Sequence, residues 1–157
     1  QLVPHRTSDL NPIRMEELVE NILKTMAKEI AERGIQVDKK ITESLPPVLA
    51  DEFGLYQVVK QLVTNAMLAM SKGGRLTLEA SAKEGGLNLA VTDTGEGIAA
   101  KDLEHVFEPF FKVSYMGEKS ELEMAACLGI IQSFGGAITV TSPGPTQGAT
   151  FTISFPV

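Results

Sequence analysis

Apolar residues recur every three or four positions in the first part of the chain, a spacing typical of one face of an α-helix. The first such run follows Asn11 and Pro12, a pair typical of a helix N-terminus, and stops at Gly34. A second run starts near Asp51 and stops at the glycines of positions 73–74. The pattern therefore predicts two helices, separated by a strand at "IQVDKKIT" and a loop at "ESLPPVLA".

The spacing of apolar residues then changes to every second position. Residues 76–82 and 87–91 alternate in this way around the turn "KEGG", which predicts a β-hairpin that ends at Asp93. A third helix is predicted at about 121–134, and "AITVTS" with "ATFTISFPV" forms a second hairpin. The predicted class is α+β: a two-layer α/β sandwich in which about three helices cover one face of a mainly antiparallel mixed sheet.

Composition narrows the function classes. The 157 residues suit one domain, and the net charge of −6 argues against a nucleic-acid partner. No apolar run is long enough to span a membrane, so we expect no membrane contact, and Cys127 is the only cysteine. Because the chain begins with Gln1 rather than Met, we expect it to be a piece of a longer protein.

The stretch "VTDTGEGIAA" at 91–100 places an acidic residue and two glycines directly after a predicted strand. Gly95 and Gly97, with Ala100, fit a dinucleotide-binding fingerprint, but that motif requires a βαβ unit and here the strand belongs to a hairpin. Two interpretations remain: a structural glycine-rich turn, or a loop that comes close to a bulky ligand.

The second helix carries two amides one turn apart, Gln61 and Asn65, at the flank of its apolar stripe. The carbonyl oxygen of an asparagine is a ligand suited to Mg²⁺ on a phosphate group. The alternative is that Asn65 only forms hydrogen bonds with a neighbouring loop.

Three segments together resemble a known family. "QLVTNAMLAM", "DTGEGI" and "FEPFFK" are similar to the N box, first glycine box and F box of sensor histidine kinase ATP-binding domains, within the gyrase–chaperone–histidine kinase–MutL ATPase superfamily. The resemblance covers about residues 10–157 and implies a Bergerat-type fold for 11–157. It also implies that residues 1–10 are a linker from an upstream dimerisation and phosphoacceptor region.

The resemblance implies a role for each matching residue. Asp93 is expected to accept a hydrogen bond from the adenine amino group, while Gly95 and Gly97 let the backbone pass the purine. Asn65 is expected to coordinate Mg²⁺ on the phosphates of ATP, and Gln61 stands where the family has its first N-box asparagine. The remaining expected nucleotide contacts are Ile98, Phe110 and Lys112.

The F box and the residues around it are expected to form a mobile lid over the nucleotide. Phe107, Phe110 and Phe111 would hold the base of this lid at about 98–119. Lys112 follows the F box, where it reaches either a phosphate or solvent. We identify no phosphate-accepting histidine in this chain, since neither His5 nor His105 has the expected surroundings.

One family motif is altered. Glu121, Leu122 and Glu123 occupy the positions of the second glycine box, whose backbone N–H groups meet the phosphates in the family. "SELE" instead reads as a capping box with Ser120 as N-cap. Two like charges about 4 Å apart at an effective dielectric constant of about 20 repel by about 4 kcal/mol, so we expect weak ATP binding.

The resemblance implies an ATP-dependent protein histidine kinase domain that donates the γ-phosphate of ATP to a histidine on a separate domain. The implied partners are the dimerisation and histidine phosphotransfer domain of the same protein and the receiver domain of a response regulator. The implied location is cytoplasmic, within a parent protein that can be membrane-anchored. The alternative is a degenerate domain that regulates or scaffolds other proteins. A chaperone-, gyrase- or MutL-type ATPase is disfavoured, because those relatives have a glutamate where Gln61 stands.

Overall fold

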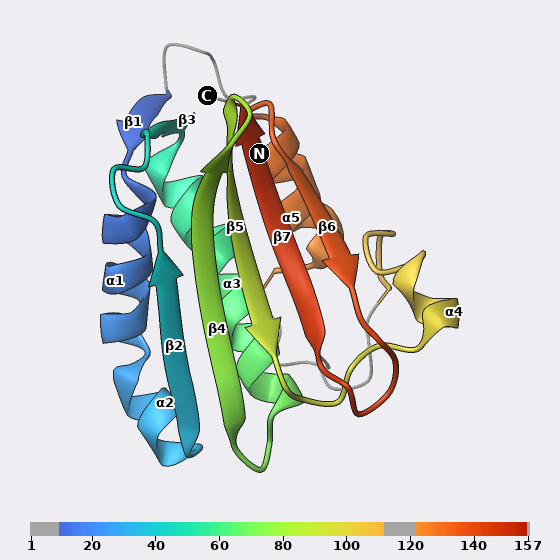
Figure 1. Cartoon of the computed structure of the whole chain (residues 1–157). Coiled ribbons are helices and arrows are strands. Elements are labelled where there is room, and N and C mark those ends of the chain that lie inside the picture. Colours follow the sequence, from blue (N-terminus) through green and yellow to red (C-terminus); the bar gives the residue numbers. More distant parts are fainter. Residues whose placement is uncertain (1–9, 112–121, 157) are drawn as a thin grey trace.

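The computed structural model describes residues 10–111 and 122–156 and contains a five-stranded sheet with helices on one face (Figure 1). Strand order is β2–β4–β5–β7–β6; β2 pairs with β4 in parallel, and all other neighbours are antiparallel. The strands are β2 (Ile35–Ile41), β4 (Gly74–Lys83), β5 (Gly86–Asp93), β6 (Ala137–Thr141) and β7 (Ala149–Pro156).

The helices that cover the sheet lie side by side (Figure 1). They are α1 (Met15–Thr25), α2 (Ala27–Glu32), α3 (Glu52–Ala69) and α5 (Met124–Gln132), whereas the short α4 (Ala100–Leu103) lies outside the β6 edge of the sheet. The predicted class, an α/β sandwich with a mainly antiparallel mixed sheet, is confirmed. No helix within the described part of the chain is both long and apolar enough to cross a membrane.

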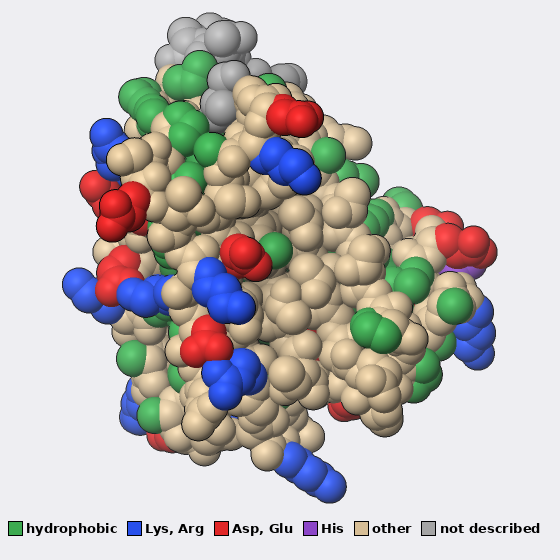
Figure 2. Space-filling view, viewed as in Figure 1, with side chains coloured by type: hydrophobic (Ala, Val, Ile, Leu, Met, Phe, Trp, Pro, Cys, Tyr) green, Lys and Arg blue, Asp and Glu red, His purple; other side chains and the backbone are tan. Residues whose placement is uncertain are grey.

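Alternation along the strands separates the two faces of the sheet. In β5, every second residue from Leu87 to Asp93 is buried against the helices, and Phe151, Ile153 and Phe155 do the same in β7. The opposite face is open (Figure 2). Its charged side chains gather over β2 and β4, where Arg75 pairs with Asp38, whereas the area over β5 and β7 is largely uncharged.

The beginning of the chain differs from the prediction. Asn11 does not cap a helix: residues Asn11–Ile13 form strand β1, which pairs antiparallel with β3 (Val48–Ala50) inside the stretch predicted to be a loop. Pro12 is compatible with this because it lies in a two-stranded sheet that leaves one side unpaired. The first helix begins at Met15, and a break at Met26 divides it into α1 and α2.

The start of the third helix also differs. Glu123 is the N-cap of α5 and makes no side-chain capping bond, so the helix begins at Met124 rather than at 121. The predicted capping box is therefore wrong: Glu123 precedes the helix instead of standing at its third position. The carboxylate of Glu123 accepts a hydrogen bond from the backbone N–H of Phe110 (2.8 Å), which pulls it away from its own helix. Ser120 and Glu121 lie outside the described residues.

The second helix and both hairpins agree with the sequence pattern. Asp51 caps α3, and its carboxylate accepts a hydrogen bond from the N–H of Gly54 (2.8 Å). β4 and β5 form the first hairpin and β6 and β7 the second, and β5 ends at Asp93 as predicted. These elements bring the ends of β5 and α3 and the start of α5 into one region of the molecule.

Candidate functional site

Asp93 is a buried carboxylate at the last position of β5. It continues the row of inward-facing residues of that strand and is 4% exposed. Its Oδ1 accepts a hydrogen bond from the N–H of Gly95 (2.8 Å). Burial raises the pKa of Asp93 from 3.8 to about 6, against the opposing effect of the backbone N–H groups of Gly95 and Ala149. A carboxylate has about four acceptor sites, so two backbone donors leave this group able to accept from a ligand.

The glycines of "DTGEGI" pack against other parts of the protein backbone. A Cβ on Gly95 would lie 2.2 Å from the carbonyl oxygen of Ala69 at the end of α3. A Cβ on Gly97, whose φ is +71°, would lie 2.2 Å from the carbonyl oxygen of Gly144. A hydrogen bond from the N–H of Glu96 to the carbonyl of Ala69 (3.0 Å) reinforces the first contact, and the N–H of Gly148 donates to the carbonyl of Gly95 (3.1 Å) on the other side of the loop. The glycines therefore have a structural reason, and their expected contact with a purine stays a prediction.

The loop between β6 and β7 holds Ile98 in place. Its side chain is 1% exposed, and its N–H donates to the hydroxyl of Ser142 (3.0 Å). The same hydroxyl donates to the carbonyl of Gly148 (2.6 Å). The "DTGEGI" loop is thus fixed at both ends before any ligand arrives.

The two amides of α3 bind each other. Gln61 and Asn65 are 4% and 1% exposed, and the Nε2 of Gln61 donates to the Oδ1 of Asn65 (2.8 Å). The Nδ2 of Asn65 points to the sulfur of Met124 (3.7 Å). The prediction that both residues share one side of α3 is confirmed, but they lie deeper than the pocket edge expected from the sequence.

The segment before α5 closes over these amides. The N–H of Leu122 donates to the Oε1 of Gln61 (3.0 Å). Glu123 follows, bound to the backbone of Phe110. The Phe110 side chain is 87% exposed and its backbone has a φ of +66°, so in this arrangement it does not line the buried amides.

The other F-box residues anchor the loop. Phe107 meets Phe151 of β7 edge to face, with ring centroids 6.3 Å apart, and Phe111 is partly buried against the core. Lys112 lies outside the described residues. His105 is partly exposed, and its hydrogen bond to Glu108 (2.7 Å) raises its pKa. His5 also lies outside the described residues.

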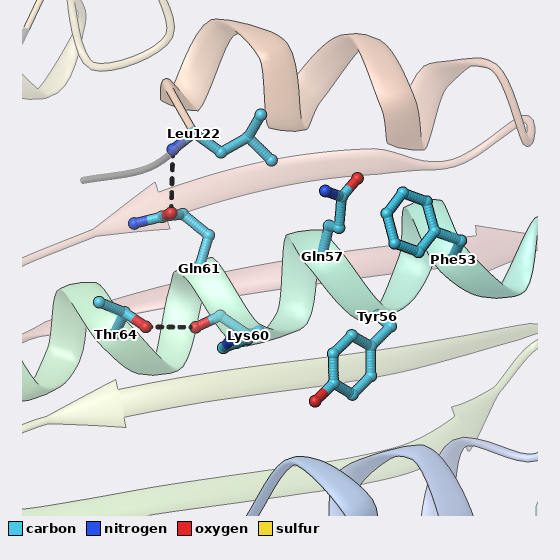
Figure 3. Close-up of a pocket in the computed structure, with 7 residues that line it drawn as sticks. All are labelled: Phe53, Tyr56, Gln57, Lys60, Gln61, Thr64 and Leu122. Atoms are coloured by element: carbon cyan, nitrogen blue, oxygen red, sulfur yellow. Dashed lines mark hydrogen bonds between the residues drawn. The ribbon is translucent and has the colours of Figure 1, made fainter. Parts of the chain in front are cut away.

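A hollow of about 240 Å³ opens beside the buried amides, on the side of α3 that is turned away from the sheet (Figure 3). Gln61 and Leu122 form one end of it, and Phe53 lies at the other end. Its lining residues are Phe53, Tyr56, Gln57, Lys60, Gln61, Thr64 and Leu122. Asp93 does not line this hollow; it is connected to the amides through the last turn of α3, which Gly95 touches at Ala69.

Residues 50–157 match the family model described as histidine kinase-, DNA gyrase B-, and HSP90-like ATPase. The chain belongs to this family. It is 32% identical over 148 residues to the sensor histidine kinase ZraS of Escherichia coli (strain K12), which covers 94% of this chain and 31% of that protein. The chain therefore spans about a third of the length of this curated relative.

Two solved structures extend the comparison. Full-length ShkA in complex with AMPPNP has a TM-score of 0.82 at 29% identity, covering 98% of this chain and 32% of ShkA. Histidine kinase ThkA in complex with the response regulator protein TrrA has a TM-score of 0.79 at 22% identity, covering 94% of this chain and 41% of ThkA. The resemblance to histidine kinase ATPase domains is thus confirmed, and the ThkA comparison supports the fold.

Several residues that hold the candidate site of this histidine-kinase-type ATPase domain were not predicted from the sequence. Ser142 and Met124 carry no recognisable signal in the sequence, because their contacts depend on where distant segments meet. Gly144 and Gly148 did carry one: glycines in "SPGPTQG" indicate a loop that packs tightly, as the backbone contacts show.

Proposed function

We propose that this chain is the ATP-binding domain of a sensor histidine kinase and donates the γ-phosphate of ATP to a histidine on another domain of the same protein. The family match and the relatives named as sensor histidine kinases support it. Residues 11–157 would form this domain, and residues 1–10 would be the linker from the upstream dimerisation and phosphoacceptor region.

The burial of the Asp93 carboxylate at the end of β5 is the observation that most directly supports the proposal. Burial raises the pKa of Asp93 to about 6, which shows that burial makes the ionised carboxylate less stable. A turn with a purely structural role does not require a buried carboxylate, so its presence favours a binding role. A buried acceptor at the end of a strand, beside a loop already held by hydrogen bonds, suits recognition of the adenine amino group. Gly95, Gly97 and Ile98 would form the backbone surface against which the base lies.

Phosphoryl transfer needs positioning and charge neutralisation rather than a covalent nucleophile on this domain. The phosphates would extend from Asp93 towards Asn65 and the start of α5, since the last turn of α3 connects the two regions. Gln61 and Asn65 would act on the phosphates through the segment before α5, which Gln61 holds at Leu122. Phe110 and Lys112 would add the further contacts that the family resemblance implies.

Mg²⁺ at Asn65, as the family resemblance implies, does not fit the arrangement seen here. The Oδ1 of Asn65 already accepts a hydrogen bond from Gln61, and Asn65 is 1% exposed. Within the described residues, no three His, Cys, Asp or Glu side chains gather in a way that could hold a metal ion. The Oδ1 of Asn65 would therefore reach a metal ion only after its bond to Gln61 breaks.

The proposed partners follow from the relatives. ThkA is described in complex with a response regulator protein, which supports a receiver domain as the partner of the parent protein here. The curated relatives are about three times longer, which supports additional domains. We propose a cytoplasmic location for this domain, within a parent that can be anchored in the membrane.

A second function is favoured by one observation. Glu123 places a carboxylate directly before α5, where the family has a glycine and phosphates meet the helix. A domain in which this carboxylate repels the phosphates of ATP would bind adenine nucleotides and regulate a partner, without transferring phosphate.

Calorimetric titration with ATP and with GTP tests nucleotide recognition. ATP is expected to bind more tightly than GTP, and Asp93→Asn should abolish ATP binding, whereas Asp38→Asn, at a partly exposed residue of β2, should not change it. Equal affinity of Asp93→Asn and the native domain would remove Asp93 from the site. Transfer of γ-labelled phosphate from ATP to the separately produced phosphoacceptor domain distinguishes the kinase from the regulatory module.

A further inference from the structure

The side-chain amide of Gln61 makes two hydrogen bonds in different directions. Its oxygen accepts from the N–H of Leu122 (3.0 Å; Figure 3), and its nitrogen donates to the Oδ1 of Asn65 (2.8 Å). One side chain therefore ties α3 to the segment that precedes α5 and also takes one of the two acceptor sites on the carbonyl oxygen of Asn65. Because Asn65 is 1% exposed, no open path leads a hydrated cation to the other site.

The spacing of the two amides favours this pair. Gln61 and Asn65 are four residues apart in α3, so their side chains lie one above the other on the same side of the helix. Both are buried, at 4% and 1% exposed, so water does not compete for the bond. A glutamine has one methylene more than an asparagine, which extends its amide towards Leu122.

Asn65 is enclosed on its other side as well. Its nitrogen points to the sulfur of Met124, which is 3% exposed. Mg²⁺ takes its ligands at about 2.1 Å in octahedral geometry and keeps several waters. For a hydrated cation to reach the Oδ1 of Asn65, Gln61 would have to turn away, breaking the Gln61–Asn65 bond and leaving the N–H of Leu122 without its acceptor.

We propose that Gln61 sets the metal requirement of this domain: it occupies the carbonyl oxygen of Asn65, so that adenine nucleotides bind nearly independently of Mg²⁺. The inference rests on nucleotide binding as proposed above. The carboxylate of Glu123, directly before α5 and bonded to the backbone of Phe110, disfavours additional phosphate charge, so the ligand best suited to the native site is a metal-free nucleoside diphosphate.

Gln61→Met tests the proposal, because methionine keeps the length and unbranched shape of glutamine but neither donates to Asn65 nor accepts from Leu122 as an amide does. Gln57→Met is the matched control: the same change one turn earlier on α3, at an exposed residue that lines the same hollow. Titration calorimetry measures the Kd of ADP for each protein in excess Mg²⁺ and in EDTA.

In the native domain and in Gln57→Met, we expect the two Kd values to agree within about twofold, whereas in Gln61→Met Mg²⁺ should tighten binding at least about tenfold. A native domain that itself gains tenfold from Mg²⁺ would overturn the inference, and so would a Gln61→Met variant that gains nothing. Either result leaves the proposed function standing. Absence of ADP and ATP binding in all three proteins, with and without metal, overturns the proposed function and the inference with it.

Folding of the variants is checked by thermal melting, and Gln61→Ala replaces Gln61→Met if the latter does not fold. Hydrogen exchange gives a readout without nucleotide. The amide of Leu122 should exchange faster in Gln61→Met than in the native domain, and Gln57→Met should match the native rate. Unchanged protection of Leu122 in Gln61→Met would contradict the bond on which the inference depends.

Discussion

The buried carboxylate of Asp93 gives the domain a pH-dependent stability that Asp93→Asn should remove. Burial raises the pKa of Asp93 from 3.8 to about 6 in the folded domain. The folded state therefore binds the proton more tightly than the unfolded chain. This contribution to stability is complete below pH 3.8 and is lost as the pH rises through about 6.

The difference between the two pKa values corresponds to about 3 kcal/mol, of which about 2 kcal/mol falls between pH about 4.5 and about 7.5. Asparagine does not titrate, so the free energy of unfolding of Asp93→Asn should not show this decrease as the pH rises. The asparagine oxygen replaces only one of two carboxylate oxygens, so the variant also loses part of the bonding to Gly95 and Ala149, by about 1 kcal/mol. That loss is the same at every pH at which Asp93 is ionised.

Urea unfolding of both proteins across this pH range measures the effect. The free energy of unfolding of Asp93→Asn minus that of the native domain should rise with pH by about 2 kcal/mol. Asp38→Asn, the same change at a partly exposed carboxylate that pairs with Arg75 on the other face of the sheet, serves as the control. A difference that stays constant, or that falls as the pH rises, would show that the Asp93 carboxylate is not held at a raised pKa.

Three further outcomes are expected. Because an ionised carboxylate accepts a hydrogen bond from the adenine amino group more strongly than a protonated carboxyl does, the affinity for ADP should fall as the pH drops through the pKa of Asp93, measured by calorimetry, and an affinity that does not change with pH would contradict this role of Asp93. Gly95→Ala should lower the free energy of unfolding by about 2–3 kcal/mol, because its Cβ would lie 2.2 Å from a carbonyl oxygen of α3, whereas Gly129→Ala, with open space around it, should raise it slightly; equal effects would refute the packing argument. Replacing Glu121 and Glu123 together with glycine should raise ATP affinity more than ADP affinity, and no gain for ATP would show that these carboxylates do not repel the phosphates.

The strands, α3 and the order of motifs were predictable because the signals are local. Alternation with a period of two marks β5, and Asp51 marks the start of α3 within four residues of the group that it binds. Asp93 was predictable for the same reason, as the polar end of an apolar strand. The family resemblance then supplied roles that no spacing could supply.

The structure differs from the sequence-based prediction where segments far apart in the sequence come into contact. The local sequence around Asn11 is typical of a helix cap. Pairing of Asn11–Ile13 with β3, more than thirty residues later in the chain, competes with helix formation and determines the structure here. Glu123 looks like a member of a capping box until its carboxylate finds the N–H of Phe110. The bond between Leu122 and Gln61 likewise joins residues far apart in sequence, so no local pattern announces it.

The position of β7 has a consequence for how the protein is made. Residues 149–156 lie between β5 and β6 in the sheet, although they follow both strands in the sequence. Until the ribosome has released them, β5 keeps an unpaired edge on the side that faces away from β4, and Leu87, Leu89 and Val91 lack their partners Phe155, Ile153 and Phe151. Completion of the sheet therefore waits for the end of synthesis of this domain. A nascent chain stalled before residue 149 should be a good substrate for chaperones and proteases.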